Sequence, residues 1–373
     1  MKIAIIRKKY TFHGGAEGFS QNLIDQLASA GHDVHVYAME WENGPRPANI
    51  TFHKLHAVRL NSTLRDLTFA VSAYLKLRHA EYDIIQSHDK TLYQDIYRAG
   101  DGCHIEWLKQ RWKRTGAGGK LSIVLNPYHW LILGIERSIF KGHRYKKILA
   151  ISEMVKRNII ENYGTSSMDI EVIYNGVDTG KFHPDNRGRY RNEIRRRHGL
   201  ADNDFVALFV GSGFERKGVE SLIKAVESIR EPVSLLIAGK GSAAKFRNKI
   251  KNQKIIFCGP RKDIMAYYAA ADIFVFPTIY EPFGNVHLEA LASGLPVITT
   301  RNSGAAEIIK DGVNGFVVSE PEDFREIAEK IKILLDRDRL KSMAENARRS
   351  AEEFTFEKYI GNISALYGKI AAK

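Results

Sequence analysis

The 373-residue chain is too long for a single ordinary hydrophobic core, so its length predicts two domains of roughly 150 to 200 residues each. Its composition, 44% hydrophobic and 10% aromatic, is that of a soluble globular protein, and its two distant cysteines, Cys103 and Cys258, exclude a disulfide framework and a clustered-thiolate zinc site. The net charge of +13 favours an anionic partner, which could be a phosphorylated ligand, an acidic lipid surface or nucleic acid.

Short apolar runs alternate with helical patterns along the chain, which is typical of parallel sheets built from βαβ units. The first residues, MKIAIIRKKY, carry too short an apolar run for a signal peptide and predict the first strand. Residues 16–31 predict a helix that ends on a glycine. The other strands expected in the first half are DVHVYAM, DIIQS, KILAI and IEVIY.

A domain boundary is expected within YNGVDTGKFHPDN, residues 174–186, where Gly, Asp, Asn and Pro accumulate. The basic run RYRNEIRRRHGL after it favours a solvated amphipathic helix over a nucleic-acid-binding patch. The strands expected in the second half are DFVALFVG, VSLLIAG, KIIFCG, DIFVFPT, LPVITT and GFVV. The sequence therefore predicts two doubly wound α/β domains, at residues 1–175 and 176–353, followed by an amphipathic helix at residues 354–373.

Open α/β sheets bind ligands at the carboxyl ends of their strands, so the residues that follow each apolar run are candidate site residues. Gly14 and Gly15 follow the first strand and lead into a helix whose first amides favour an anion, although a plain tight turn explains them about as well. After the strand that ends at Gly211, the loop GSGFERKG places Arg216 and Lys217 beside a helix start, which suits a diphosphate. The loop satisfies neither the dinucleotide-binding fingerprint nor the P-loop, and an ordinary basic surface turn is the alternative.

The stretch YEPFGNVHLEALASGLPVITT carries two acids, Glu281 and Glu289. On one continuous helix they would lie about 12 Å apart along the axis, which excludes a helical pair of glycosidase carboxylates. The proline and glycine between them instead predict a helix that begins near Gly284 or Asn285, with Glu281 in the preceding loop. Amides at Gly284, Asn285 and Val286 could then hold a phosphate while the two acids accept hydrogen bonds from sugar hydroxyls, with a merely solvated Glu289 as the alternative.

D-x-D pairs, which hold a divalent cation in one class of sugar-transferring enzymes, occur at Asp202 with Asp204 and at Asp336 with Asp338. The first pair precedes its strand and the second lies between late helices, so both positions favour a capping role. No spacing of His, Cys and carboxylate residues predicts a metal site.

Taken in order, these stretches resemble the retaining GT-B glycosyltransferases of family GT4 over nearly the whole chain. The resemblance is carried by HGGAEGF, VIYNGVDTGKFHP, FVGSGFERKG, LLIAGKG, FCGPRKDIMAYYAAADIFVFPT, YEPFGNVHLEALASGLPVITT and GAAEII. Within the family, GSGFERKG and HDKTLYQDIYRAGDGCH look most like the bacterial lipopolysaccharide core glucosyltransferase I group. The resemblance implies two Rossmann-like domains facing across a cleft, with the C-terminal helix crossing back to the N-terminal domain.

The resemblance also implies roles for the cations and acids of the second domain. Arg216 and Lys217 would bind the donor diphosphate, Glu289 the ribose hydroxyls and Glu281 the donor sugar. Preorganised cations and helix amides would stabilise the charge on the departing diphosphate without a metal ion.

Further roles follow from the same resemblance. Gly15 and the amides from Gly284 to Val286 would add phosphate contacts, and Arg261, in GPRKDI, matches the region that frames the nucleotide base. Asp101, in AGDGCH, falls where the family places a residue, often His, beside the reacting sugar.

A basic aromatic segment lies at residues 106–147, with ten Lys or Arg against two acids, whereas the rest of the first 175 residues is slightly acidic. It holds Trp107, Trp112 and Trp130 beside the apolar run IVLNPYHWLILGI. As a helix this run would reach only about 22 Å, too short for a hydrocarbon core of about 30 Å. Its composition favours contact with an anionic membrane surface, and a buried helix with a solvated basic flank is the alternative.

The leading interpretation is a retaining, metal-independent glycosyltransferase without a cofactor, which moves a hexose, expected to be glucose, from a UDP-sugar to a lipopolysaccharide core or related cell-envelope glycan. The expected partners are the donor, this acceptor and an anionic membrane surface, without nucleic acid. The expected location is the cytoplasm, with peripheral attachment to the inner membrane. A nucleotide-sugar epimerase of the same fold and a non-catalytic basic membrane- or nucleic-acid-binding protein are the alternatives.

Overall fold

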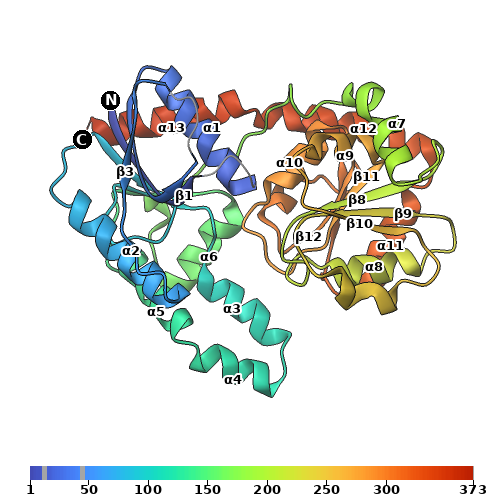
Figure 1. Cartoon of the computed structure of the whole chain (residues 1–373), viewed down its shortest axis with the longest axis horizontal. Coiled ribbons are helices and arrows are strands. Elements are labelled where there is room, and N and C mark those ends of the chain that lie inside the picture. Colours follow the sequence, from blue (N-terminus) through green and yellow to red (C-terminus); the bar gives the residue numbers. More distant parts are fainter. Residues whose placement is uncertain (11–14, 43–46, 373) are drawn as a thin grey trace. The chain divides into compact units, whose positions relative to one another are not determined.

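The computed structural model describes residues 1–10, 15–42 and 47–372, and the chain divides into two compact units (Figure 1). The N-terminal unit comprises Met1–Tyr174 and Tyr359–Lys373, and the C-terminal unit comprises Asn175–Lys358. The first division falls one residue from the predicted boundary. The second falls at Lys358, inside the last helix.

The N-terminal unit is built on a parallel sheet, which within the described residues has seven strands in the order β3-β2-β1-β4-β5-β6-β7. Within this sheet, Ile3 of β1 pairs with Val34 of β2 on one side and with Ile84 of β4 on the other. The strands are β1 (Lys2–Tyr10), β2 (Asp33–Trp41), β3 (Ile50–Lys54), β4 (Ile84–Ser87), β5 (Ile96–Ala99), β6 (Lys147–Ala150) and β7 (Ile170–Val172). The helices are α1 (Gly15–Ser29), α2 (Ser62–Leu77), α3 (His104–Lys113), α4 (Ala117–Leu125), α5 (Pro127–Phe140), α6 (Glu153–Tyr163) and the 3₁₀ helix η1 (Ser167–Asp169).

The C-terminal unit, all of whose residues are described, has a six-stranded parallel sheet in the order β10-β9-β8-β11-β12-β13. Its strands are β8 (Val206–Val210), β9 (Ser234–Ala238), β10 (Ile255–Gly259), β11 (Ile273–Phe276), β12 (Val297–Thr300) and β13 (Gly315–Val318). Its helices are α7 (Asn186–Arg197), α8 (Val219–Glu227), α9 (Ile264–Ala270), α10 (Asn285–Ala292), α11 (Phe324–Ile333), α12 (Arg337–Ala351) and the 3₁₀ helices η2 (Ala243–Lys249), η3 (Gly304–Ile308) and η4 (Glu352–Phe354). The strand order reverses between β8 and β11, which is where doubly wound sheets bind ligands.

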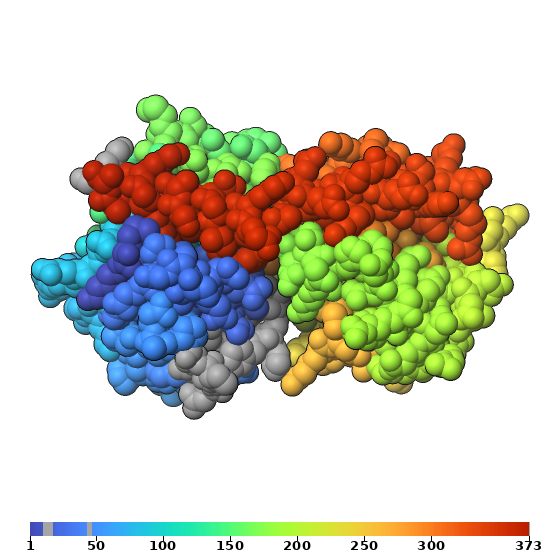
Figure 2. Space-filling model, turned by 90° about the horizontal axis from the view of Figure 1, so that it is seen from above, coloured from blue at the N-terminus to red at the C-terminus, as the bar shows by residue number. Residues whose placement is uncertain are grey.

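The last helix, α13 (Phe356–Ala371), returns the chain to the N-terminal unit. The Tyr359 ring meets Phe19 edge-on with 4.8 Å between centroids, and the Tyr367 hydroxyl donates a 2.9 Å hydrogen bond to Gln86 in β4. Figure 2 shows this segment, in red, against the first residues of the chain, in blue. The N-terminal unit is therefore completed by the end of the chain.

The basic run after the domain boundary forms α7, and as predicted for a solvated amphipathic helix it exposes Arg189, Arg196 and Arg197. Its buried face, however, also carries charge. Arg195 is fully buried, and with Arg191 it clasps Asp272, each guanidinium lying 2.9 Å from a different carboxylate oxygen. Asp272 also accepts the backbone N–H of Val206 at 2.9 Å. These ion pairs hold α7 against the start of β11, so Arg191 and Arg195 have a structural role.

The second D-x-D pair confirms the capping interpretation, because Asp336 is the N-cap of α12 and accepts hydrogen bonds from the amides of Asp338 and Arg339. In the first pair, Asp204 accepts a 2.9 Å hydrogen bond from the amide of Ala201 in the loop before β8, so it stabilises a turn and not a helix end. Over residues 1–10, 15–42 and 47–372, no group of three His, Cys, Asp or Glu side chains is placed to hold a metal ion. In the same ranges no helix is both long and apolar enough to cross a membrane.

Candidate functional site

The loops that follow β8 and β11 are joined at the switch point of the C-terminal sheet. The carbonyl of Arg216 accepts the Ile279 amide at 3.0 Å. Gly218 has φ +75°, and a Cβ there would lie 1.9 Å from the Pro277 carbonyl oxygen, so only glycine permits this approach. The chain after Gly218 enters α8, which leaves Arg216 and Lys217 facing the loop that carries Glu281.

Glu281 pairs with both cations of this loop. Its Oε2 contacts the Lys217 ammonium directly and lies 3.5 Å from the Arg216 guanidinium, which also donates a 2.8 Å hydrogen bond to the Tyr280 carbonyl. Burial and the neighbouring Arg216 lower the pKa of Lys217. The cluster thus places two basic side chains beside one acid, with Lys217 and Glu281 11% and 13% exposed and Arg216 37% exposed, so an added anion would be attracted to it.

The helix start predicted after Glu281 is confirmed, because α10 begins at Asn285 with Gly284 as its N-cap. Gly284 has φ +80°, a conformation that favours glycine, and α10 begins at the next residue. The Asn285 side chain accepts a 2.7 Å hydrogen bond from Asn175. A helix N-terminus next to two basic side chains is suited to an anionic group.

His287, which the sequence analysis did not single out, fixes this turn from within the core. It is fully buried, with Nδ1 2.8 Å from the Gly284 carbonyl and Nε2 2.9 Å from the Thr299 hydroxyl. Since a carbonyl can only accept, Nδ1 carries the proton. The Thr299 hydroxyl lies between Nε2 and the Phe276 carbonyl, to which it donates at 3.2 Å. Burial lowers the pKa of His287 to about 4, so the ring is neutral near pH 7.

Protonation of His287 should weaken the fold in acid. Because its pKa is lower in the folded chain than in the unfolded chain, its stabilisation is complete above about pH 6.5 and is lost as the pH falls towards 4. We expect this residue to account for about 3 kcal/mol of the free energy of unfolding lost between pH 7 and pH 4. Denaturant titrations of wild type and His287→Gln measure it. The variant should be less stable at pH 7 and lose less on acidification, and equal pH slopes would contradict the assignment.

Tyr268, on α9, holds the second predicted acid. Its hydroxyl lies 2.9 Å from Glu289 Oε2 and 3.3 Å from the Val286 carbonyl. Burial raises the pKa of Glu289, and the Tyr268 hydrogen bond partly offsets this. The acid is thereby fixed one helical turn beyond the α10 start, as a positioned hydrogen-bonding group rather than the solvated glutamate of the alternative reading.

Gly211 and Arg261 were also predicted to bind the donor, and they lie outside the Lys217–Glu281 pair. Gly211 follows β8, and a Cβ there would lie 3.2 Å from the Phe276 ring. Arg261 follows β10, two strands away from β8 in the sheet, and its guanidinium lies 5.3 Å from the Tyr267 ring centroid. Its described contact is thus with Tyr267 and not with the Lys217–Glu281 pair.

The remaining candidates belong to the N-terminal unit. Gly15 is the first residue of α1, and Gly14 lies outside the described residues. Asp101 is exposed in the turn between β5 and α3, where Gly102 has φ +65°.

A buried polar cluster that the sequence analysis missed lies near Asp101. Glu136 is fully buried on α5 and accepts two hydrogen bonds, one from the Tyr163 hydroxyl at 2.5 Å and one from the His104 amide at 2.6 Å. Its carboxylate also lies 3.5 Å from the Lys90 ammonium. Burial alone would lower the pKa of Lys90, but Tyr97, Glu136 and Asp101 raise it well above the usual value. A charged lysine therefore lies at the carboxyl end of β4, close to the predicted catalytic position.

Two doubly wound parallel units, the second with paired cations and acids at its switch point, define a GT-B glycosyltransferase. The chain belongs to glycosyltransferase family 4. The family model described as "Glycosyltransferase Family 4" matches residues 13–181, and the model described as "Glycosyl transferases group 1" matches residues 190–350. Proteins of this type use a nucleotide-sugar donor and a glycan acceptor.

Individual relatives agree with this assignment. The lipopolysaccharide glucosyltransferase WaaG of Escherichia coli (strain K12) is 26% identical over 94% of each chain, and the capsular polysaccharide biosynthesis glycosyltransferase CapM of Staphylococcus aureus is 33% identical over 55% of this chain and 56% of its own. The crystal structure of WaaG matches with a TM-score of 0.82 and 25% identity over 98% of this chain and 99% of its own. HepE of Anabaena, solved with UDP and glucose, matches with a TM-score of 0.75 at 20% identity over 99% of each chain, which shows the shared fold.

Proposed function

We propose that the protein is a retaining, metal-independent hexosyltransferase, without a cofactor, that transfers glucose from UDP-glucose to a lipopolysaccharide core or related cell-envelope glycan. The observation that carries the proposal is the Lys217–Glu281–Arg216 cluster at the start of α10. The similarity to WaaG along 94% of both chains supports the choice of sugar and acceptor.

The cluster suggests how a departing diphosphate would be stabilised. Glu281 pairs with both basic side chains in the structure, and a bound diphosphate would compete with it for Lys217 and Arg216. Glu281 would then be free to accept a hydrogen bond from a hydroxyl of the transferred sugar. Glu289, held by Tyr268, would accept hydrogen bonds from the ribose hydroxyls. Preorganised cations and helix amides supply stabilisation where charge develops in the transition state.

The other site residues keep the roles that the family resemblance implies. Gly15 and the amides from Gly284 to Val286 would contact phosphate, Arg261 would frame the base, and Gly14 and Gly211 would line the donor site. Asp101 would lie beside the reacting sugar.

The direct test is release of nucleoside diphosphate from a panel of UDP-, GDP- and ADP-sugars, with and without truncated lipopolysaccharide. We expect release of UDP from UDP-glucose that depends on the acceptor and gives an α-linked product. Release that ignores the acceptor, conversion of the sugar without transfer, or a preference for GDP- or ADP-sugars would overturn the proposal.

We further propose that the enzyme works on the cytoplasmic face of the inner membrane, attached through residues 106–147. On α4, Leu121, Val124 and Leu125 are 48 to 63% exposed, and on α5 Trp130 is 62% exposed. The inward face of α5, by contrast, is part of the core, so the alternative of a buried helix applies to that face. A short apolar helix beside basic and aromatic residues is suited to the headgroup region of an anionic bilayer.

Co-sedimentation with vesicles checks this attachment. We expect the protein to bind vesicles that contain phosphatidylglycerol, to bind neutral vesicles at least tenfold more weakly, and to lose binding as salt rises. The variant Leu125→Ser should bind more weakly. Equal recovery with both vesicle types would contradict the attachment.

A further inference from the structure

Helix α2 is apolar on two opposite faces. Its inward face buries Phe69, Ala70, Ala73 and Leu77 against the N-terminal sheet. Its outward face carries Leu64, Leu67, Val71 and Leu75 at helical spacing, and these side chains are 36 to 57% exposed. A surface helix ordinarily turns polar residues outward, so this outward apolar stripe requires a partner.

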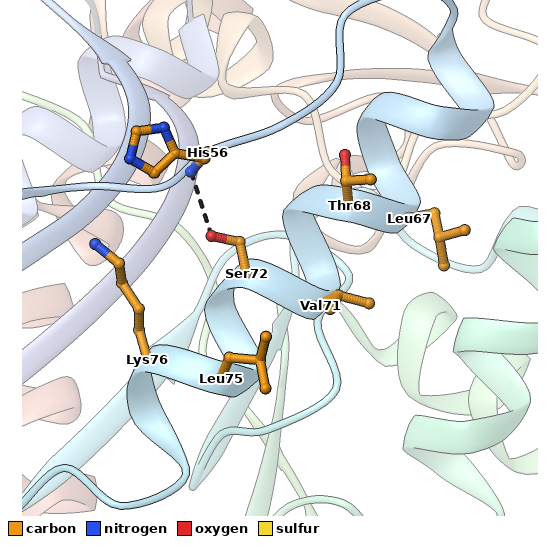
Figure 3. A pocket seen from close by; sticks show the side chains of 7 residues that line it. All are labelled: His56, Leu67, Thr68, Val71, Ser72, Leu75 and Lys76. Atoms are coloured by element: carbon orange, nitrogen blue, oxygen red, sulfur yellow. Dashed lines mark hydrogen bonds between the residues drawn. The ribbon is translucent and has the colours of Figure 1, made fainter.

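The stripe borders a shallow groove of about 480 Å³, lined by His56, Leu67, Thr68, Val71, Ser72, Leu75 and Lys76. Figure 3 shows Leu67, Val71 and Leu75 along α2, with Lys76 and His56 towards the other side of the groove. The His56 amide donates a 3.2 Å hydrogen bond to the Ser72 hydroxyl, which fixes the loop before α2 beside the helix. The groove is thus apolar along one side and basic at one end.

The charge around the stripe has one sign. Residues 47–80, all described, carry five Lys or Arg and a single acid, Asp66, which is buried in ion pairs with Lys8 and Arg65. The residues of the first 175 that lie outside both 47–80 and 106–147 carry nine Lys or Arg and 14 Asp or Glu. The positive charge of this half is therefore concentrated in two segments, each of which also exposes apolar side chains.

The two segments meet in the fold. Helix α2 packs against α5, and α3 packs against both α4 and α5 (Figure 1). Helix α2 thus adjoins α5, which carries the exposed Trp130 of the surface proposed for membrane attachment. A bilayer fits this combination, because it offers apolar area and negative charge over a surface wide enough to reach both segments.

We propose that the outward face of α2, with its groove, is a second contact with an anionic phospholipid bilayer. This inference rests on the proposed membrane attachment and extends it from one contact to two. A single short helix leaves a protein free to rotate on a surface, whereas two contacts on the same unit define one orientation. The N-terminal unit would therefore meet the bilayer in a fixed pose.

Vesicle binding by three variants tests the second contact. The double variant Val71→Ser with Leu75→Ser removes exposed apolar area, Lys76→Gln removes one charge, and Val313→Ser, whose side chain is 45% exposed in the C-terminal unit, is the matched control. On vesicles containing phosphatidylglycerol we expect about tenfold weaker binding for the double variant, from the transfer free energy of the lost side chains, and no change for the control. For Lys76→Gln we expect about fivefold weaker binding on these vesicles and no change on neutral ones.

A fluorescent label at position 75 tests the pose. Both native cysteines are buried, so an environment-sensitive probe attached to Leu75→Cys should report that position alone. We expect a blue shift on binding to anionic vesicles, and no shift for the same probe on Val313→Cys.

The outcomes separate the two proposals. If Leu125→Ser weakens vesicle binding and the α2 double variant does not, the second contact is wrong and the attachment stands; if wild type does not bind at all, both are wrong. If the protein forms dimers without lipid and the double variant abolishes them while vesicle binding is unchanged, the partner of α2 is a second copy and the proposal is overturned. Nucleoside diphosphate release with a soluble acceptor should be equal in wild type and the double variant, whichever result is obtained for lipid.

Discussion

Replacing Lys217 by alanine is expected to lower kcat by about 10²- to 10³-fold, the usual effect of removing one group that stabilises developing charge in a transition state. Lys217 is almost completely buried and contacts Glu281, next to the N-terminus of α10. In the variant, Arg216 would still face Glu281, so the acid would not be left without a cation. Steady-state release of nucleoside diphosphate, compared with thermal unfolding of the same samples, measures the effect.

The control is Lys224→Ala on α8, because Lys224 is 49% exposed and pairs only with Glu220 across one helical turn. It should leave kcat unchanged. Near-normal turnover of Lys217→Ala, or a loss of folded protein that accounts for the loss of activity, would contradict a role for Lys217 at the diphosphate.

Replacing Asp272 by asparagine is expected to destabilise the protein by about 3 to 5 kcal/mol, because a buried guanidinium then loses its counter-charge. Arg195 is fully buried and Arg191 is mostly buried, and both bind the Asp272 carboxylate. The free energy of unfolding from denaturant titration gives the effect directly.

An exposed ion pair of the same helix supplies the comparison. Asp263 pairs with Arg197 at 3.2 Å, and both side chains are about 40% exposed. Asp263→Asn should therefore change the free energy of unfolding by less than about 1 kcal/mol. Similar losses for the two variants would show that α7 is not fastened through Asp272.

The fold could be predicted from the sequence because its strands are buried on both faces and read as continuous apolar runs. Runs such as DIFVFPT and VSLLIAG coincide with strands β11 and β9. Two strands were missed because they lack a continuous apolar run. ITFHK, now β3, lies at the edge of its sheet and carries polar residues, and IYRA, now β5, buries an arginine in a run of four residues.

The candidate site was predicted in part. Glycine, proline and the paired acids marked the α10 start, because backbone conformation and helix capping depend on nearby residues. The roles of His287 and Tyr268 depend on what packs around them in three dimensions. The signal that could have found them is a ring with a polar atom within an apolar helix, namely the histidine of NVHLEALA and the two tyrosines of AYYAAA. Similarly, nothing in RYRNEIRRRHGL shows that Asp272, some 80 residues later, would neutralise it.

The return of α13 to the N-terminal unit also bears on how this chain can be synthesised and folded. During synthesis, residues 1–174 emerge from the ribosome long before Tyr359 and Tyr367. In the folded chain, Tyr359 packs against Phe19 and Tyr367 donates a hydrogen bond to Gln86. The surface of the N-terminal unit that α13 covers therefore stays exposed until the C-terminal unit has been synthesised. Domains usually fold as units in the order of synthesis, but here the first to emerge is the last to be completed.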